Sequence, residues 1–306
     1  MTSPFGPLVI IANPRAGRGT VERHLPEIER SLTDAGLPYR IVRTTHPGHA
    51  AEAARDALGR GERYLVAAGG DGTVHEVLNG MLGTGGRVVP DAVLGIVAAG
   101  SGCDIVRSLG LPGDAIRASR HLTGDAVRRI DVGKITFTSG GTEATRFFAN
   151  IAEAGLGAAV VARTGRLPRF LGRAKYFCGF WLTLPTFHPA VVRLDSGDSS
   201  FEWRAHNVVV ANCQFFGGGM HISPKSRPDD GVLDVLAMVG PKIDAFTMLP
   251  KIYKGTHLPH RDIAEAQAAT VRLDADPPLL IEADGELLGT TPATVEVVPG
   301  AIRVKV

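Results

Sequence analysis

The feature that most constrains the fold is a change of hydrophobic period after residue 68. Tyr64–Ala68 is a short apolar run with the length of one buried strand, and Gly69-Gly70-Asp71-Gly72-Thr73 follows it directly. Beyond this turn, apolar side chains recur at the spacing of one helix face, at Val74, Val77, Leu78 and Met81. A buried strand therefore enters a glycine turn and leaves as a helix. Glycines let a ligand approach the backbone closely, and the start of a helix offers N–H groups and a positive dipole end that suit a phosphate.

An ordinary strand–helix turn is the simpler interpretation of this stretch. Three glycines around one aspartate, with Thr73 at the start of the helix, are more specialised than turning alone requires. Asp71 adds a carboxylate that can hold a magnesium ion or orient a hydroxyl. We therefore interpret residues 69–73 as a phosphate-binding turn.

Length, charge and cysteine usage set the wider limits. The 306 residues, 44% of them apolar, indicate one large or two ordinary globular domains, and the net charge of +2 is too small to favour nucleic acid. Cys103, Cys178 and Cys213 are widely spaced and read as reduced thiols of a cytoplasmic protein. The first apolar run breaks at Asn13-Pro14, which does not resemble a signal peptide. No apolar run approaches about 18 residues, so any membrane contact is expected to be peripheral.

The first part of the chain alternates strands with helices. The predicted strands are 8–12, 39–43, 64–68, 93–97 and 127–132. This spacing predicts a parallel, doubly wound sheet with helices on both faces. Ligands of such sheets bind beyond the carboxyl ends of the strands. Three glycine-bearing loops lie there, at 13–19, 69–73 and 98–104, and their convergence is a stronger argument than any one of them.

After Gly133 the pattern becomes mostly β. The predicted strands are 135–137, 147–151, 191–194, 208–211, 233–238, 270–273, 279–282 and 294–298. Helical length is available only near 158–185 and 241–255. The sequence therefore predicts a second domain dominated by antiparallel β structure.

These loops resemble those of the lipid kinase family that contains diacylglycerol, sphingosine and ceramide kinases. The matching segments of the first domain are Asn13-Pro14 through Gly17, Thr44 ahead of Gly48-His49-Ala50, Gly69–Thr73 followed by Glu76-Val77 and Asn79-Gly80, and Gly100-Ser101-Gly102-Cys103-Asp104. Those of the second domain are Gly217-Gly218-Gly219, Pro224, Asp229–Asp234 and Asp284-Gly285-Glu286. The resemblance covers nearly the whole chain.

The resemblance implies a fold and a role for each of its two domains. It implies a nucleotide-binding α/β domain over 1–132, similar to NAD kinases and phosphofructokinases, and a lipid-substrate β-sandwich domain over 133–293. It also implies that the last strand, about 294–306, returns to the first domain. Active sites of this family lie in the interdomain cleft, where the γ-phosphoryl group of ATP passes to a lipid hydroxyl with the help of Mg²⁺.

The resemblance also implies roles for individual residues. The expected nucleotide contacts are Asn13, Pro14, Arg15, Ala16, Gly17, Thr44, Gly69, Gly70, Asp71, Gly72, Thr73, Val74, His75, Gly100 and Ser101. Asp71 and Asp104 are expected to bring carboxylates to a catalytic Mg²⁺, directly or through water. Glu286 is the first candidate for the general base and Asp284 the second.

Two of these assignments have a plain alternative. Asp284-Gly285 is a common pair in hairpin turns, so the segment can be a turn and nothing more. Asp229-Asp230-Gly231 also reads as a turn, whereas the resemblance implies a structural Mg²⁺ held by Asp230 and the main-chain carbonyls of Arg227 and Val232.

Two positions depart from the family pattern. Ala98-Ala99 stands where a proline is common before the glycine of the third loop, and Cys103 stands where asparagine is usual. A thiol cannot replace both the donor and the acceptor of an amide. These departures leave open a catalytically silent nucleotide- or lipid-binding regulator. A NAD kinase is the second rival because it shares Gly-Gly-Asp-Gly-Thr, although the stretch from Gly95 to Pro112 follows the lipid kinase pattern.

The expected partner is a lipid at a membrane surface. Basic residues lead into an aromatic stretch, at Arg163, Arg166, Arg169, Arg173 and Lys175 before Tyr176–Leu182. Such a pattern suits an anionic membrane, but the aromatic side chains are better explained as packing within the second domain. Nucleic acid is not expected, and a homodimer is the assembly that the residues leave open.

Overall fold

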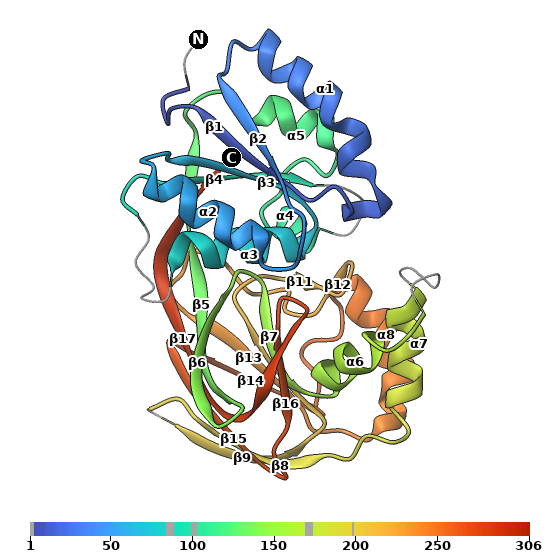
Figure 1. Ribbon diagram of the computed structural model, residues 1–306. Helices are drawn as coiled ribbons and strands as arrows, with labels where there is room; N and C mark the ends of the chain where they lie inside the picture. Colours follow the sequence, from blue (N-terminus) through green and yellow to red (C-terminus); the bar gives the residue numbers. More distant parts are fainter. Residues whose placement is uncertain (1–2, 84–88, 99–102, 169–173, 198) are drawn as a thin grey trace. The chain divides into compact units, whose positions relative to one another are not determined.

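The computed structural model describes residues 3–83, 89–98, 103–168, 174–197 and 199–306 (Figure 1). The chain forms two compact units. The N-terminal unit comprises Met1–Val132 and Pro299–Val306, and the β-rich unit comprises Gly133–Val298. Among the described helices, none has the length and apolar character needed to span a bilayer.

The N-terminal unit alternates strands and helices as predicted. Its elements are β1 (Leu8–Ala12), η1 (Ala16–Arg18), α1 (Thr20–Asp34), β2 (Tyr39–Arg43), α2 (His49–Gly59), β3 (Tyr64–Gly69), α3 (Asp71–Leu82), β4 (Val93–Ala98), α4 (Asp104–Ser108) and α5 (Ala115–His121). The strands lie in the order β4-β3-β1-β2, and every neighbouring pair is parallel.

Helices cover both faces of this sheet. On one face α1 packs against α5, and on the other α2 packs against α3 (Figure 1). Alternate residues of β1, such as Leu8 and Ile10, share a core with the apolar stripe of α1. Pro26 lies inside α1 on its exposed side, where the helix tolerates it. Gly80 lets α2 and α3 approach closely, because a Cβ there would collide with the backbone of Ala51.

The β-rich unit carries most of its residues in antiparallel strands. Its elements are β5 (Val127–Ser139, which begins in the N-terminal unit), β6 (Thr142–Phe148), β7 (Ile151–Gly155), α6 (Leu156–Thr164), α7 (Ala174–Thr183), β8 (Ala190–Asp195), β9 (Ser200–Ala205), β10 (Asn207–Ala211), β11 (Phe215–Phe216), β12 (Met220–His221), β13 (Leu233–Met238), η3 (Lys242–Asp244), α8 (Ala245–Lys254), β14 (Ile263–Ala268), β15 (Thr270–Asp276), β16 (Leu280–Ala283) and β17 (Glu286–Lys305).

Two antiparallel layers share one core. One layer follows the order β14-β13-β10-β7-β16-β17, and the other runs β9-β8-β15-β17. Val208 and Val210 of β10 point into this common core, while Val209 faces the opposite way and packs with Met248 and Ile252 of α8. A strand buried on both faces reads as a continuous apolar run, which explains the sequence of β10.

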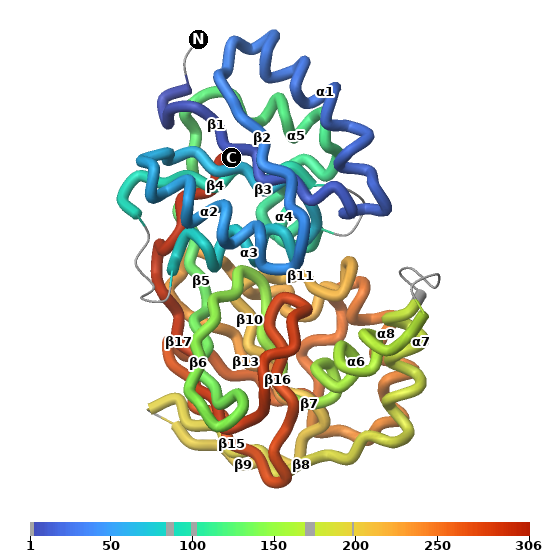
Figure 2. The backbone as a smooth tube through the Cα atoms, viewed as in Figure 1, coloured from blue at the N-terminus to red at the C-terminus, as the bar shows by residue number. Residues whose placement is uncertain are grey.

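The long strand β17 continues beyond the β-rich unit. Near its start it pairs with β16, farther along with β15, and its residues Arg303 and Val304 pair in parallel with Val93 and Leu94 of β4. Figure 2 traces its path in red.

The structure differs from two of the predicted strands. The predicted strand 127–132 is the first part of the longer β5, which pairs with β6 and β17 and with none of the four strands of the parallel set directly. The predicted strand 147–151 is divided, because β6 ends at Phe148 and β7 begins at Ile151. The N–H groups of Ala149 and Asn150 bond to the carboxylate of Asp284 instead of a neighbouring strand.

Candidate functional site

The order of the parallel strands creates a switch point at β1. The strand has β2 on one side and β3 on the other. The connection from β1 therefore runs toward β2 and the connection from β3 runs the other way, toward β4, and both start at the carboxyl ends of the strands. Ligands of open α/β sheets bind outside the carboxyl ends of strands at such a point. Two backbone hydrogen bonds hold the loops there, from Asn13 N to Ala68 O (3.0 Å) and from Thr44 N to Ala12 O (2.8 Å).

The loops after β1 and β3 are also joined through side chains. Asn13 Nδ2 donates to Thr73 Oγ1 at 3.4 Å. Asn13 Oδ1 accepts from Arg15 N at 3.0 Å, which fixes the start of the loop that continues through Pro14 and Ala16. Gly17 has a positive φ of 57°, a left-handed conformation that favours glycine. The structure thus gathers the predicted residues 13–17, Thr44 and 69–73 at one edge of the sheet.

The turn after β3 is made of small residues. A Cβ on Gly69 would collide with the side chain of Thr73, whereas a Cβ on Gly70 would meet nothing within 4 Å. Helix α3 begins at Asp71, and the first turn of a helix presents N–H groups that lack carbonyl partners within the helix. The turn is therefore open to a ligand and suited to an anion.

Asp71 connects the second glycine loop to the third. Its Oδ1 accepts hydrogen bonds from Asp104 N (2.8 Å) and Ile105 N (3.3 Å), the first backbone groups of α4. Cys103 is the N-cap residue of α4, and its own side chain makes no capping bond. Asp71 therefore caps a helix from a distance, a role that its position in the sequence did not indicate.

The two aspartates differ in their suitability for magnesium. Carboxylate oxygens are the ligands that Mg²⁺ prefers, and half-buried Asp71 meets that requirement. Asp104 is only 3% exposed, and its Oδ1 accepts from Arg107 Nη1 at 2.7 Å. Because Arg107 neutralises Asp104, Asp71 is the better candidate of the two. Gly100 and Ser101 lie outside the described residues.

The thiol of Cys103 is buried beside this carboxylate. Burial raises the pKa of Cys103 well above its ordinary value, and the charge of Asp71 raises it further. The side chain is therefore a neutral thiol at neutral pH.

Val74 and His75 lie on α3 and are buried. Asn79 Nδ2 donates to the carbonyl oxygen of His75 and lies 3.3 Å from His75 Nε2. The structure places both residues within the helix, beyond the glycine turn, and their predicted contact with nucleotide stays a prediction.

Glu76 has a positioning role that sequence reasoning missed. Its carboxylate accepts from Gly48 N (3.0 Å) and Ala50 N (3.1 Å), at the start of α2. This holds the loop between Thr44 and α2 next to α3. The signal in the sequence was the acidic residue itself, five positions after Asp71 and close to the helix start.

In the β-rich unit, Asp284 and Gly285 form the two-residue turn between β16 and β17, with Ala283 paired to Glu286. Both turn residues have positive φ, 49° and 88°, as a tight hairpin of this length requires. The carboxylate of Asp284 accepts from the N–H groups of Ala149, Asn150 and Ile151 at 2.9–3.2 Å.

The turn therefore does more than reverse the chain. Three backbone bonds fix Asp284 and leave it little capacity to accept a proton from another group. Glu286 is exposed at the start of β17. Of the two candidates for a base, Glu286 is the more accessible.

Asp230 lies in an exposed turn between Arg227 and Val232. Its Oδ1 accepts from Val232 N at 3.2 Å, and Gly231 has a positive φ of 75°. Within the described residues, no cluster of three or more His, Cys, Asp or Glu side chains is arranged to hold a metal ion. The predicted site takes two ligands from main-chain carbonyls, so it stays a prediction.

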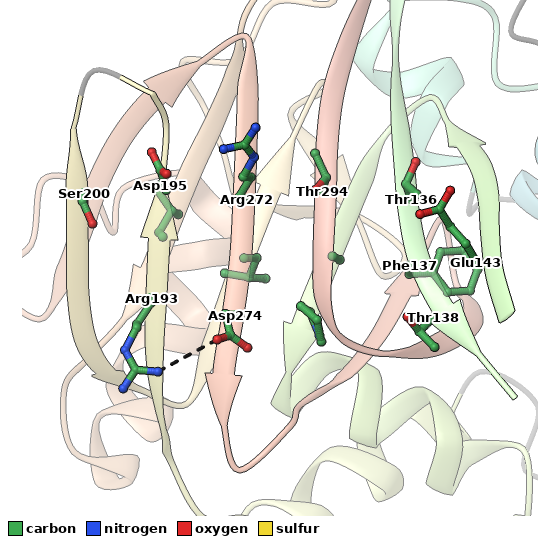
Figure 3. Close-up of a pocket in the computed structure, with 14 residues that line it drawn as sticks. Thr136, Phe137, Thr138, Glu143, Arg193, Asp195, Ser200, Arg272, Asp274 and Thr294 are labelled. Atoms are coloured by element: carbon green, nitrogen blue, oxygen red, sulfur yellow. Dashed lines mark ion pairs between the residues drawn. The ribbon is translucent and has the colours of Figure 1, made fainter. Parts of the chain in front are cut away.

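A groove of about 360 Å³ lies elsewhere in the β-rich unit (Figure 3). Strands β5, β6, β17, β15, β8 and β9 line it, and Arg193 Nη1 on β8 lies 3.9 Å from Asp274 Oδ2 on the neighbouring β15. None of the predicted site residues lines this groove.

Glu76→Ala tests the positioning role of Glu76. The substitution leaves two N–H groups at the start of α2 without their acceptor, so we expect a loss of about 1–3 kcal/mol in unfolding free energy. Amide exchange at residues 44–50 should accelerate more than elsewhere. Glu52→Ala, at an exposed position of α2, is the control. It should change both the unfolding free energy and the amide exchange at 44–50 much less. Unchanged exchange at 44–50 in Glu76→Ala would contradict the role.

Known protein families match both parts of the chain. Residues 7–135 match the diacylglycerol kinase catalytic domain, and residues 150–306 match the YegS C-terminal NAD kinase beta sandwich-like domain. A diacylglycerol kinase of Bacillus subtilis (strain 168) is 27% identical over 286 residues, which cover 92% of this chain and 90% of the relative.

Solved structures support the fold. The crystal structure of a diacylglycerol kinase from Bacillus anthracis str. Sterne has a TM-score of 0.75 at 24% identity, covering 99% of this chain and 97% of that one. Yeast NADH kinase complexed with NADH has a TM-score of 0.51 at 11% identity, covering 97% and 82%. The prediction of an NAD kinase-like α/β domain followed by an antiparallel β-sandwich is confirmed. Because the two matched domains follow one another over nearly the whole chain, this protein belongs to the diacylglycerol kinase family of lipid kinases, phosphotransferases with an alcohol group as acceptor.

Proposed function

We propose that this protein transfers the γ-phosphoryl group of ATP to a hydroxyl of a diacylglycerol-, sphingoid- or ceramide-like lipid. The observation that carries the proposal is the hydrogen bond from Asn13 to Thr73, which joins the loops after β1 and β3 at the switch point of the sheet. The backbone N–H groups of these loops would hold the nucleotide phosphates.

Phosphoryl transfer depends on positioning and charge neutralisation. Asp71 would hold the Mg²⁺ that accompanies ATP, directly or through water, while its bonds to α4 keep the second and third loops in register. A bound Mg²⁺ would neutralise charge on the phosphates. Glu286 would accept the proton of the lipid hydroxyl as that oxygen attacks phosphorus.

A lipid panel tests the proposal directly. Transfer of labelled phosphate from ATP would be measured with diacylglycerol, sphingosine and ceramide in mixed micelles, with NAD as the control acceptor. We expect turnover with one lipid class and none with NAD. Turnover with NAD alone would favour the small-molecule kinase, and ATP binding without transfer to any acceptor would favour a silent regulator.

Asp71→Asn tests the nucleotide site. Asparagine keeps an oxygen that can accept the N–H groups of α4 but removes the charge, so the unfolding free energy should change by about 1 kcal/mol or less. Turnover should fall about 10²-fold or more because the electrostatic stabilisation is lost. Asp114→Asn is the matched control, since Asp114 caps α5 by accepting from Arg117 N at 2.9 Å. Retention of most of the activity in Asp71→Asn would remove Asp71 from the mechanism.

Glu286→Gln tests the base. The change keeps the shape but not the basicity, so turnover should fall by about 10²–10⁴ while the affinity for ATP stays the same. Asp284→Asn should lower stability as well, because an amide NH₂ would face backbone N–H donors. Glu296→Gln, on the same strand, is the control. If Glu286→Gln keeps near wild-type turnover, Glu286 is not the base.

We also propose that α7 and α8 dock the protein on an anionic membrane. The rings of Trp181 on α7 and Phe246 on α8 lie 4.5 Å apart, so the helices are neighbours (Figure 1). Their exposed apolar side chains, together with Ile243 just before α8, are Tyr176, Phe177, Leu182, Ile243, Phe246 and Tyr253. Phe177 is 62% exposed, whereas Phe180 and Trp181 pack against buried Leu156 and Val160.

Charge favours an anionic surface over a protein partner here. Basic side chains lie on α7 and α8, on the short turns before α8 and after α6, and at the end of α6, at Arg163, Arg166, Lys175, Lys242, Lys251 and Lys254. Arginine and lysine beside exposed aromatic side chains are typical of helices that lie in the membrane interface. Arg169 and Arg173 lie outside the described residues.

The double variant Phe177→Ser with Phe246→Ser tests this surface. Its binding to phosphatidylglycerol vesicles in a sedimentation assay should weaken at least about tenfold, because two large apolar groups no longer enter the bilayer. Raised salt should weaken the wild type as well. Ile116→Ser, an exposed apolar position on α5, is the control. Wild-type binding by the double variant would exclude this surface.

A further inference from the structure

Two glutamates lie side by side in the interior of the β-rich unit. Glu153 of β7 and Glu282 of β16 are opposite each other in neighbouring antiparallel strands, and each is 3% exposed. Neither residue has a part in the proposed transfer. Two ionised carboxylates on directly opposed, buried positions would repel each other strongly. The pair therefore needs a positive charge, hydrogen-bond donors or a proton to offset this repulsion.

That compensation does not come from a basic side chain. Within the described part of the chain, no lysine, arginine or histidine forms an ion pair with either carboxyl group. The residues opposite the pair on the flanking strands are Val209 of β10 and Leu287 of β17, both uncharged. Asp284 is the nearby charged group, and its negative charge acts against ionisation of Glu282.

The surroundings of the two carboxyl groups differ. Glu153 Oε1 accepts from Asn207 Nδ2 at 2.8 Å, and Asn207 Oδ1 in turn accepts from Gly157 N at the start of α6. The carboxylate of Glu153 lies so close to Gly157 that a Cβ there would collide with it. An amide donor and the positive end of a helix both favour a negative charge on Glu153. Glu282 has one backbone donor, Gly285 N, but the negative charges of Glu153 and Asp284 act against its ionisation, so it is the member that keeps a proton.

Glu282 also contacts the turn that carries the candidate base. Its Oε2 accepts from Gly285 N at 2.7 Å. Asp284 anchors the other half of the turn to residues 149–151, and Glu286 comes next in the chain. The turn is therefore held at two points, by the carboxylate of Asp284 and by the buried carboxyl group of Glu282.

We propose that Glu282 and Glu153 are positioning residues, a buried carboxyl–carboxylate pair that shares one proton and holds the Asp284–Gly285 turn so that Glu286 is placed for the reaction. This inference rests on the proposed function of Glu286. The proton lies on Glu282, which donates to Glu153, while the other oxygen of Glu282 receives the N–H group of Gly285.

The pair makes stability depend on pH. Burial raises the pKa of Glu153 to about 7 and raises that of Glu282 well above its ordinary value, with the charge of Glu153 as the next cause. Both values lie above the ordinary 4.5 of the unfolded chain, so the native state binds the proton more tightly. This contribution is complete below about pH 4.5 and is lost as the pH rises through the folded pKa values. Loss of the shared proton should release the turn.

Glu282→Gln separates the proton from the shape. Glutamine donates an N–H group to Glu153 and accepts from Gly285 N, but it does not titrate. We expect near wild-type turnover at neutral pH, and a smaller decrease of turnover and stability than in the wild type as the pH is raised. The infrared spectrum at pH 7 should lose a carboxylic-acid carbonyl band. Glu202→Gln, on the exposed face of β9, is the control and should leave all three readouts unchanged.

Glu282→Leu removes the acceptor for Gly285. Its turnover should fall about 10–100-fold at unchanged affinity for ATP, because a small displacement of a catalytic group is enough for such a loss. If this variant does not fold, Glu153→Gln takes its place: it removes a charge that raises the pKa of Glu282, so the alkaline loss of stability should move to lower pH. Wild-type pH profiles and an unchanged infrared spectrum in Glu282→Gln would overturn the proposal. The infrared and stability readouts need no substrate, so an absence of lipid phosphorylation would contradict the proposed function separately.

Discussion

The parallel pairing of β1 with β2 on one side and β3 on the other is the constraint on which the candidate site depends. It brings the carboxyl ends of these strands to one edge, and it sends their connecting loops in opposite directions. Hydrogen bonds join segments there that are far apart in the sequence, from Asn13 Nδ2 to Thr73 Oγ1 and from Thr44 N to Ala12 O. Small residues keep the space open, and the start of α3 supplies the polarity that an anion needs.

Carboxylates hold the loops in place throughout the molecule. Asp71 bonds to the start of α4, Glu76 to the start of α2, and Asp284 to the backbone at 149–151. In each case a charged acceptor satisfies backbone N–H groups of a distant segment, and such bonds are stronger than those between neutral groups. Residues that look catalytic in the sequence therefore also position the loops of the site. Substitution by the isosteric amide keeps an acceptor oxygen and removes the charge, so it separates the structural role from the catalytic role better than alanine does.

Much of the fold could be predicted because it is encoded locally. Apolar runs bounded by glycine gave the parallel strands, and the apolar spacing from Val21 to Leu32 gave α1. The division of 147–151 into two strands could not be predicted, because it depends on Asp284, more than 130 residues away. Glu76 and the pair of Glu153 with Glu282 were missed for the same reason. A glutamate in an apolar strand was visible at Glu282, but its partner is defined only by the register of β16 on β7.

The central claim is that the loops at the switch point bind the phosphates of ATP. Hydrogen–deuterium exchange measured with and without MgATP tests it most directly, because it reports on each segment without requiring an acceptor lipid. The account predicts slower exchange at residues 13–19, 44–50 and 69–75 on addition of MgATP. Protection confined to the β-rich unit, or no protection at saturating MgATP, would contradict it.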